Sequence, residues 1–213
     1  MLKGPVIGPM IICGVCFNEK DLDYLSKIGV KDSKKLTSKK RDELAKLIKE
    51  KCFSFKAIIL SVKEIDQRET KNLTLNRLEE LKFAEILNEL KPDQIFLDAA
   101  DVKEERFGRS INELLDYTPS KIISRHHADD IYPIVSASSI IAKDLRDKII
   151  DDLKNKYGDM GSGYPSDKKT TDFIRNWIKK NKTLPPYVRK SWKTTKTIWN
   201  EELGNRKITD FIS

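Results

Sequence analysis

Short apolar runs alternate with helix-like patterns along most of this 213-residue chain, and this alternation limits the fold more than any other feature. Apolar and β-branched side chains predict strands over 6–17, 53–62, 94–97 and 121–124. Helices are predicted over 21–28, 37–52, 74–90 and 104–115, and Pro133 opens a long helix to about Tyr157. Strands that alternate with helices predict an α/β domain in which helices cover a central sheet.

The character of the chain changes after Gly158, where no further strand is predicted. Residues 161–200 hold 10 Lys and Arg against 2 Asp and Glu, together with all three tryptophans. We therefore expect a sheet domain over 1–157, a basic helical region over 158–204 packed on it, and a tail over 205–213. In the whole chain Lys and Arg outnumber Asp and Glu by 41 to 33, and this net charge of +8 favours a nucleic acid or another anionic partner.

No stretch is apolar over a length that crosses a membrane, and the best candidate, 6–17, is interrupted by two glycines and a proline. Neither a membrane span nor a signal peptide is expected. The three cysteines do not form a disulfide framework, so we expect a cytoplasmic monomer. Cys13 and Cys16 form a C-x-x-C, but residues three apart on a strand point to opposite faces, which favours buried cysteines over a zinc or redox pair.

Acidic residues follow two of the predicted strands. Asp98 comes directly after 94–97, and Asp129 and Asp130 lie in the short loop before the helix that Pro133 opens. If those strands run parallel, the carboxylates share the sheet edge where ligands bind in open α/β folds. Carboxylate oxygens suit Mg²⁺ or Mn²⁺, which activate water for in-line displacement at phosphorus. The pattern points to metal-dependent phosphodiester hydrolysis, with loop and helix-capping roles for these aspartates as the alternative.

Basic residues near hydroxyl or aromatic side chains predict phosphate contacts, with a solvated surface as the alternative for each group alone. The candidates are Lys34, Lys35, Arg189 and Lys193. His126 and His127 adjoin the acidic loop. Adjacent residues of an extended chain point apart, so these histidines are expected to support the site rather than to share a metal.

Several motifs, taken in their order along the chain, resemble ribonuclease HII, particularly the archaeal type. The matching stretches are GPVIGPM at 4–10, VKDSKKLT at 30–37, DAADV at 98–102 with ERF at 105–107, ADDIYPIVSASS at 128–139, GSGYPSD at 161–167 and VRKSWK at 188–193. The resemblance implies an RNase H-like fold, with a mixed central sheet flanked by helices. It also implies metal-dependent cleavage of the RNA strand of RNA/DNA hybrids and cleavage 5′ of ribonucleotides embedded in duplex DNA, leaving a 3′-hydroxyl and a 5′-phosphate.

The same resemblance implies roles for particular residues. Asp98 and Asp129 fall on two of the four metal-binding carboxylates of the family. Tyr164 falls on the tyrosine that packs at the RNA–DNA junction and helps to sense the ribose 2′-hydroxyl. Lys3 and Gly4 match the end of the family's Gly-Arg-Gly loop, whose backbone contacts the same ribose, and Pro5 adjoins them.

The sequence departs from the family at its start. The family has a strand leading into Asp-Glu-Ala-Gly-Arg-Gly, whereas Met1-Leu2-Lys3 directly precede Gly4 here. The other two carboxylates and their strand have no counterpart, and two carboxylates hold two divalent ions poorly. We expect a coding start that omits roughly a dozen residues, because the rest of the chain keeps the nuclease pattern. The alternative is a catalytically impaired hybrid-binding homologue; a basic structural protein of a ribonucleoprotein explains the charge but not the acids.

The end of the chain resembles the peptide with which replication proteins dock on the sliding clamp. That peptide has an amide residue, an aliphatic residue three positions on, and two bulky residues three further on. The corresponding residues are Asn205, Ile208, Phe211 and Ile212, with asparagine in place of the usual glutamine and isoleucine in place of an aromatic. The resemblance implies the clamp as a partner beside nucleic acid, and an ordinary frayed tail is the alternative.

Overall fold

The computed structural model describes residues 4–30 and 36–204. These residues form two compact units, each built from separate stretches of the chain. The sheet unit consists of Ile11–Ile59 and Leu73–Asp147, and the helical unit of the described parts of Met1–Met10, Leu60–Asn72 and Lys148–Ser213. The division predicted from the sequence, at 157 and 204, stays a prediction, and its last part lies outside the described residues.

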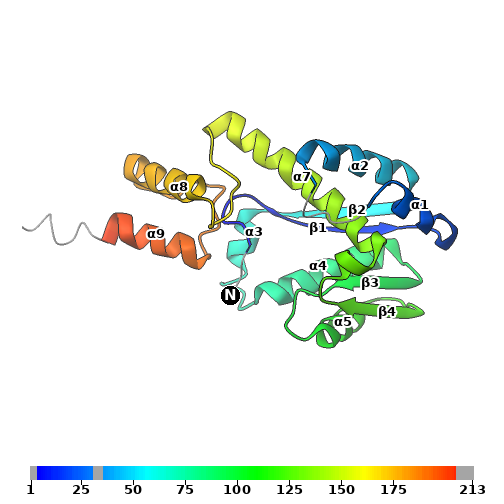
Figure 1. Ribbon diagram of the computed structural model, residues 1–213. Helices are drawn as coiled ribbons and strands as arrows, with labels where there is room; N and C mark the ends of the chain where they lie inside the picture. Colours follow the sequence, from blue (N-terminus) through cyan, green and yellow to red (C-terminus); the bar gives the residue numbers. More distant parts are fainter. Residues whose placement is uncertain (1–3, 31–35, 205–213) are drawn as a thin grey trace, which may run out of the picture. The chain divides into compact units, whose positions relative to one another are not determined.

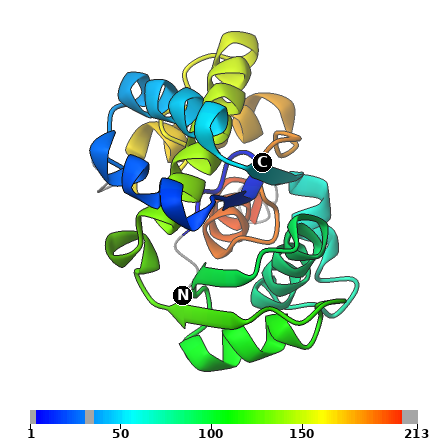
Figure 2. The same ribbon diagram turned by 90° about the vertical axis from the view of Figure 1, so that its right-hand side faces the viewer.

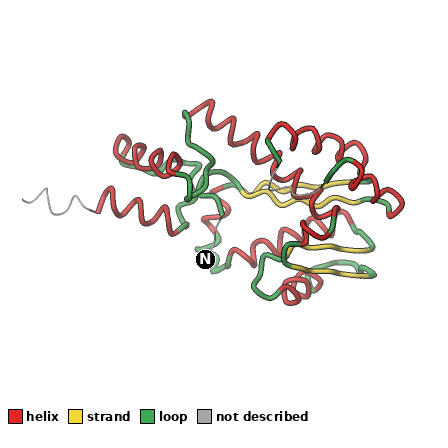
Figure 3. The backbone as a smooth tube through the Cα atoms, viewed as in Figure 1, coloured by secondary structure: helices red, strands yellow, loops and turns green. Residues whose placement is uncertain are grey.

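The described strands pair two by two (Figures 1 and 3). β1 (Met10–Cys16) pairs with β2 (Ser54–Leu60), and β3 (Gln94–Asp98) pairs with β4 (Lys121–Arg125). β3 and β4 are parallel, in a register that sets Asp98 opposite Arg125. Both strands therefore end at the same edge of their sheet, which confirms the condition under which the aspartates that follow them come together.

The helices agree closely with the sequence pattern. They are η1 (Glu19–Asp21, a 3-10 turn), α1 (Leu22–Lys27), α2 (Ser38–Lys51), α3 (Val62–Gln67), α4 (Leu75–Leu90), α5 (Glu104–Asn112), α6 (Ala128–Ile131), α7 (Pro133–Tyr157), α8 (Lys168–Asn181) and α9 (Lys193–Gly204). α2 and α4 begin after Thr37 and Thr74, whose side chains accept backbone N–H groups of the first turn. α3 was not expected, although Ser61 and Glu64 form a capping box that the sequence shows as S-x-x-E.

The first strand is shorter than the apolar run 6–17. β1 begins only at Met10, because Gly8 has a φ of 87° and Pro9 has no N–H to donate to a ladder. Val6 and Ile7 are fully buried in the helical unit instead, where Ile7 forms an antiparallel bridge with Val188. The apolar run therefore serves two units rather than one continuous strand.

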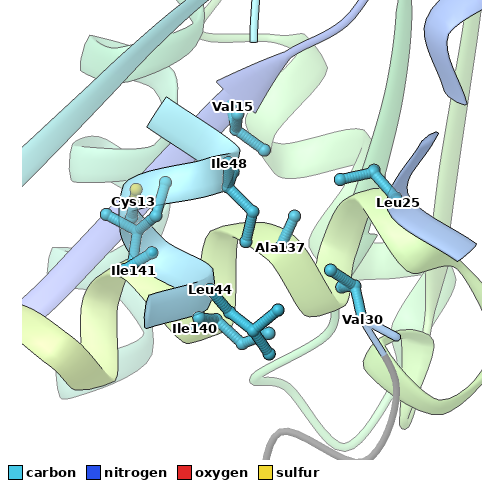
Figure 4. Close-up of a cluster of buried hydrophobic side chains, with 10 residues drawn as sticks. Cys13, Val15, Leu25, Val30, Leu44, Ile48, Ala137, Ile140 and Ile141 are labelled. Atoms are coloured by element: carbon cyan, nitrogen blue, oxygen red, sulfur yellow. The ribbon is translucent and has the colours of Figure 1, made fainter. Parts of the chain in front are cut away.

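The two faces of β1 pack against different helices. Cys13 and Val15 join a buried cluster with side chains of α1, α2 and α7 (Figure 4). Gly14 lies on the other face, where an added Cβ would come within 2.6 Å of Ile86 on α4. Glycine is needed there for this close approach. Burial raises the pKa of the Cys13 thiol to about 12, which supports a structural cysteine rather than a zinc or redox ligand.

A second core lies between β3, β4 and the helices α4 and α5. In Figure 2 the two green strands run side by side with α5 below them. Phe107 of α5 is fully buried against Leu87, Ile95 and Leu97, and its ring meets Phe83 edge to face at 5.6 Å. This core fixes the two strands whose ends carry the acidic residues.

The helical unit is held by aromatic packing and ion pairs. The rings of Tyr157 and Tyr187 lie 4.6 Å apart, and Trp177 of α8 packs edge-on to both. Arg175 of α8 pairs with Glu201 and Glu202 of α9 at 2.6 and 2.9 Å. Among the residues that the structure describes, no helix has the length and apolarity to span a membrane.

Candidate active site and nucleic-acid interface

The two aspartates predicted to bind metal come from neighbouring segments of the sheet unit. Asp98, the exposed last residue of β3, accepts the backbone N–H of Ala128 through Oδ1 at 3.2 Å. Asp129 is the next residue, and it is buried, with 6% of its surface exposed. Asp129 and Asp130 do not lie in a loop as expected, but within the short helix α6. The structure thus places Asp98 beside the start of the helix that carries Asp129.

Glu104 of α5 links the segments that follow β3 and β4. Its carboxylate accepts the backbone N–H of His126 at 2.8 Å and the guanidinium of Arg125 at 2.9 Å. The His126 ring lies within hydrogen-bonding distance, 3.2 Å, of the Val102 carbonyl. The hydrogen bond from the His126 N–H, followed by the Arg125 guanidinium, holds the pKa of Glu104 below its ordinary value. Sequence reasoning missed Glu104, because its partners lie about twenty residues along the chain.

Asp101 orders the loop between β3 and α5. It is buried, accepts the N–H of Lys103 at 2.9 Å, and pairs with the guanidinium of Arg106. The Arg106 hydrogen bond is the main reason that the pKa of Asp101 lies below its usual value. Asp101 stands in the DAADV motif but is not among the site residues predicted from the sequence. Its contacts make it a support for the loop that follows Asp98.

The carboxylates of Asp98 and Asp129 are of the chemical type that binds a hard divalent cation, but they supply few ligands. Asp98 and Asp129 offer the carboxylate oxygens that Mg²⁺ and Mn²⁺ prefer. Within 4–30 and 36–204, no group of three or more His, Cys, Asp or Glu side chains is arranged to hold a metal ion. His127 has a φ of 55°, and its Nδ1 lies 3.9 Å from the carboxylate of Asp130. His127 therefore lies beside Asp130, while the His126 ring faces the Val102 carbonyl.

The predicted ribose contacts come together in the helical unit. The backbone N–H groups of Val6 and Ile7 both donate to the Gly163 carbonyl, at 2.8 and 3.1 Å. The indole N–H of Trp192 donates to the Gly4 carbonyl at 3.3 Å. The segment that begins with Gly4 and Pro5 is therefore hydrogen-bonded to Gly163, the residue that precedes Tyr164. The side chain of Tyr164 is partly exposed. Lys3 lies outside the described residues.

Carboxylate and hydroxyl groups hold the loop around Tyr164. Asp167 accepts the N–H of Ser162 at 2.7 Å and, as the N-cap of α8, the N–H of Lys169 at 3.0 Å. The Ser162 hydrogen bond is the first cause of the lowered pKa of Asp167. Gly161 has a φ of 67°, and an added Cβ there would lie 2.5 Å from the Asp167 carboxylate. The glycines of the motif thus let the loop wrap closely around Asp167.

The four candidate phosphate ligands have different placements. Arg189 is 1% exposed, and its guanidinium donates to the carbonyls of Gly8 and Pro9 at 3.0 and 2.7 Å while lying 4.7 Å from the Trp192 ring. A buried guanidinium with these partners favours a structural role over the phosphate contact expected for it. Lys193 is exposed at the start of α9. Lys34 and Lys35 lie outside the described residues, as do Asn205, Ile208, Phe211 and Ile212.

Asp98 ends β3, and Asp129 lies in the short helix that follows the parallel strand β4. Carboxylates at this edge of an α/β sheet, in a chain with a net charge of +8, are typical of metal-dependent nucleases. A family model for ribonuclease HII matches residues 3–195, and the chain belongs to the ribonuclease HII family. It is 47% identical over 197 residues to a ribonuclease HII of Methanocella arvoryzae, covering 92% of this chain and 87% of that protein.

Two solved structures are similar to the chain over 95% of its length and 95% of theirs. The ribonuclease H2 from Pyrococcus horikoshii OT3 has a TM-score of 0.87 and 41% identity. The ribonuclease HII of Archaeoglobus fulgidus, solved in complex with PCNA, has a TM-score of 0.84 and 39% identity. These similarities confirm the family, the fold class and the class of enzyme predicted from the sequence.

Proposed function

We propose that the chain is an endoribonuclease that hydrolyses the RNA strand of RNA/DNA hybrids and cleaves 5′ of single ribonucleotides in duplex DNA, leaving a 3′-hydroxyl and a 5′-phosphate. The observation that carries the proposal is the hydrogen bond from the Ala128 N–H to Asp98, which sets Asp98 beside the segment of Asp129. This pairing lies at the shared edge of two parallel strands, in a chain whose family match spans residues 3–195.

In this proposal Asp98 and Asp129 hold Mg²⁺ or Mn²⁺. When bound, the cation supplies Lewis-acid chemistry, making water a better nucleophile and offsetting charge at phosphorus. Glu104 and Asp101 keep the two acidic segments in place through their hydrogen bonds to His126 and Lys103. Loss of supporting contacts around metal ligands commonly lowers metal affinity or activity about 10–100-fold.

Recognition of the ribose falls to the helical unit. Tyr164 packs against the ribose of the junction nucleotide, and the backbone of Lys3, Gly4 and Pro5 contacts its 2′-hydroxyl, the group that distinguishes RNA from DNA. Support comes from the hydrogen bonds of Val6 and Ile7 to Gly163, which join the two recognition segments. Lys34, Lys35 and Lys193 contribute phosphate contacts that carry no sequence preference.

A catalytically impaired hybrid-binding protein is the second candidate function. The observation that favours it is the absence, within the described part of the chain, of a group of three or more metal-ligating side chains. Such a protein binds hybrids with a steep salt dependence but does not cleave them.

Cleavage of a labelled DNA duplex with one ribonucleotide tests the first candidate against the second. The assay uses Mg²⁺ or Mn²⁺ and compares the chain with Asp98→Asn, Asp129→Asn and the matched control Asp130→Asn. Cleavage 5′ of the ribonucleotide that the first two changes abolish and the third keeps would support the nuclease. Binding without cleavage would support the hybrid-binding alternative, and cleavage that survives Asp98→Asn and Asp129→Asn would refute the assigned site.

We further propose that the segment with Asn205, Ile208, Phe211 and Ile212 docks on a sliding clamp. The similar ribonuclease HII of Archaeoglobus fulgidus was solved in complex with PCNA, which supports a partner of this kind. Deleting residues 205–213 is expected to abolish clamp binding and to leave hybrid binding unchanged. Clamp association that survives the deletion would contradict the proposal. A cytoplasmic location stays a prediction, supported by the free state of Cys13, Cys16 and Cys52.

A further inference from the structure

A cavity of about 560 Å³ lies in the helical unit, between α9 and the segment that follows α8. Its lining residues are Thr183, Leu184, Lys190, Lys196, Trp199 and Asn200. Among the described residues, none that is assigned above to cleavage or ribose recognition lines it. The described lining thus offers two cations, an indole, an amide and a hydroxyl, with no acidic side chain among them.

Trp199 is the lining residue without an evident structural task. Trp177 packs against Tyr157 and Tyr187. The ring of Trp192 makes cation–π contacts with the guanidinium groups of Arg68 and Arg189, at 5.4 and 4.7 Å. For Trp199, half-buried on α9, the described structure contains no comparable ring or cation contact. Residues three and four apart share one face of a helix. Lys196, Trp199 and Asn200 therefore lie on the same face of α9.

The side chains of both lysines that line the cavity are exposed to solvent. Asp66 accepts the backbone N–H groups of Lys190 and Ser191, both at 3.0 Å, which fixes the backbone while the Lys190 side chain stays exposed. The ammonium of Lys196 lies 3.2 Å from Glu69, and both side chains are about half exposed. An ion pair in contact with water is weak, so Lys196 can exchange this partner for a phosphate.

We infer that this cavity binds a nucleotide of single-stranded nucleic acid, with the base stacked on Trp199 and the flanking phosphates at Lys190 and Lys196. Every base has an aromatic face, so stacking on an indole is tolerant of sequence, and a neighbouring cation neutralises the backbone. Asn200 and Thr183 supply polar groups for the base edge. The site extends the proposed function to substrates with a single-stranded flank, but its binding does not depend on cleavage.

Fluorescence anisotropy with two labelled duplexes tests the inference on the full chain. Both carry one ribonucleotide; one is blunt and the other has a short oligothymidylate extension. We expect about 10-fold tighter binding of the extended duplex, in the range of one stacked base. Trp199→Ala should reduce this preference to none, and Trp199→Phe, which keeps an aromatic face, should retain most of it. Lys190→Ala should weaken the preference, whereas Lys180→Ala, an exposed lysine of α8 outside the cavity, should not.

Binding and cleavage of the blunt duplex provide the control, and we expect both to be unchanged in Trp199→Phe. Equal binding of the two duplexes by the unchanged chain would overturn the inference. An equal loss of the preference in Lys180→Ala and Lys190→Ala would also overturn it, because it would indicate a nonspecific effect of charge. The same holds if Trp199→Ala and Trp199→Phe weaken the binding of both duplexes equally. Failure of blunt-duplex cleavage alone would count against the proposed nuclease and not against this site.

Discussion

Replacing Arg189 by methionine separates a structural role from a phosphate contact. Methionine fills a similar volume but removes the hydrogen bonds to the carbonyls of Gly8 and Pro9 and the stacking on Trp192. Two buried carbonyls left unpaired cost about 1–3 kcal/mol each. The lost cation–π contact adds about 1–2 kcal/mol. Relief from burying a charge offsets part of this sum. We expect a net loss of about 3 kcal/mol in the free energy of unfolding.

Thermal melting and salt titration together measure both roles. For a chain of this length, about 3 kcal/mol lowers Tm by about 6–12 °C. If Arg189 is structural, the slope of log affinity for a hybrid against log salt concentration stays unchanged in Arg189→Met. The matched change Lys193→Met, at an exposed position, should flatten that slope by about 0.9 and shift stability by less than about 0.5 kcal/mol. A flatter slope with unchanged stability in Arg189→Met would refute the reasoning.

Three further predictions follow from single contacts. Glu104→Ala should reduce cleavage about 10-fold and raise the Mn²⁺ concentration needed for half-maximal cleavage, because Glu104 no longer accepts the His126 N–H. Glu105→Ala, at the exposed neighbouring position, is the control. Equal effects of the two changes would refute the supporting role of Glu104. The pKa of Asp167 is lowered from 3.8, so its hold on the Ser162 N–H is complete above about pH 4 and is lost as pH falls through the lower folded value. The protection of the Ser162 amide, that is, its exchange rate relative to an unstructured amide at the same pH, should therefore fall as the pH drops below about 4 in the native chain. Asp167→Asn should show no such pH-dependent loss of protection. Phe107→Ala should cost about 3–5 kcal/mol in urea unfolding, against less than about 1 kcal/mol for the exposed Phe53; similar losses at the two positions would contradict the assigned core.

Local chemistry made much of the fold predictable. The sequence predicts helices that start at Thr37 and Thr74, and the structure shows both threonines as N-caps. The signal is local, because the hydroxyl and the N–H that it accepts lie three residues apart. The apolar runs that end near Asp98 and Arg125 form strands, as their apolar and β-branched residues predicted. This signal too depends only on neighbouring residues. The S-x-x-E pattern of Ser61 and Glu64 is an equally local signal for the start of α3, although the apolar pattern of 53–62 predicts a strand up to Val62.

The candidate site was predictable only in part. Strand ends and motif order mark Asp98 and Asp129 as candidates, and their role in the site stays a prediction. Glu104 was missed because its contact with His126 spans 22 residues, and only the packing of α5 on the strands creates it. No pattern of neighbouring residues predicts a hydrogen-bond partner that far along the chain.

The sequence by itself determined which segments become helices and strands, where the acids follow the strands, and to which family the chain belongs, because these depend on neighbouring residues and motif order. Only the tertiary structure decided that Arg189 is buried on the carbonyls of Gly8 and Pro9, about 180 residues away along the chain. The same is true of the cavity at Trp199. Burial and long-range hydrogen bonds arise from folding, so a charge that suggests a phosphate contact in the sequence acquires its actual partner only in the folded protein.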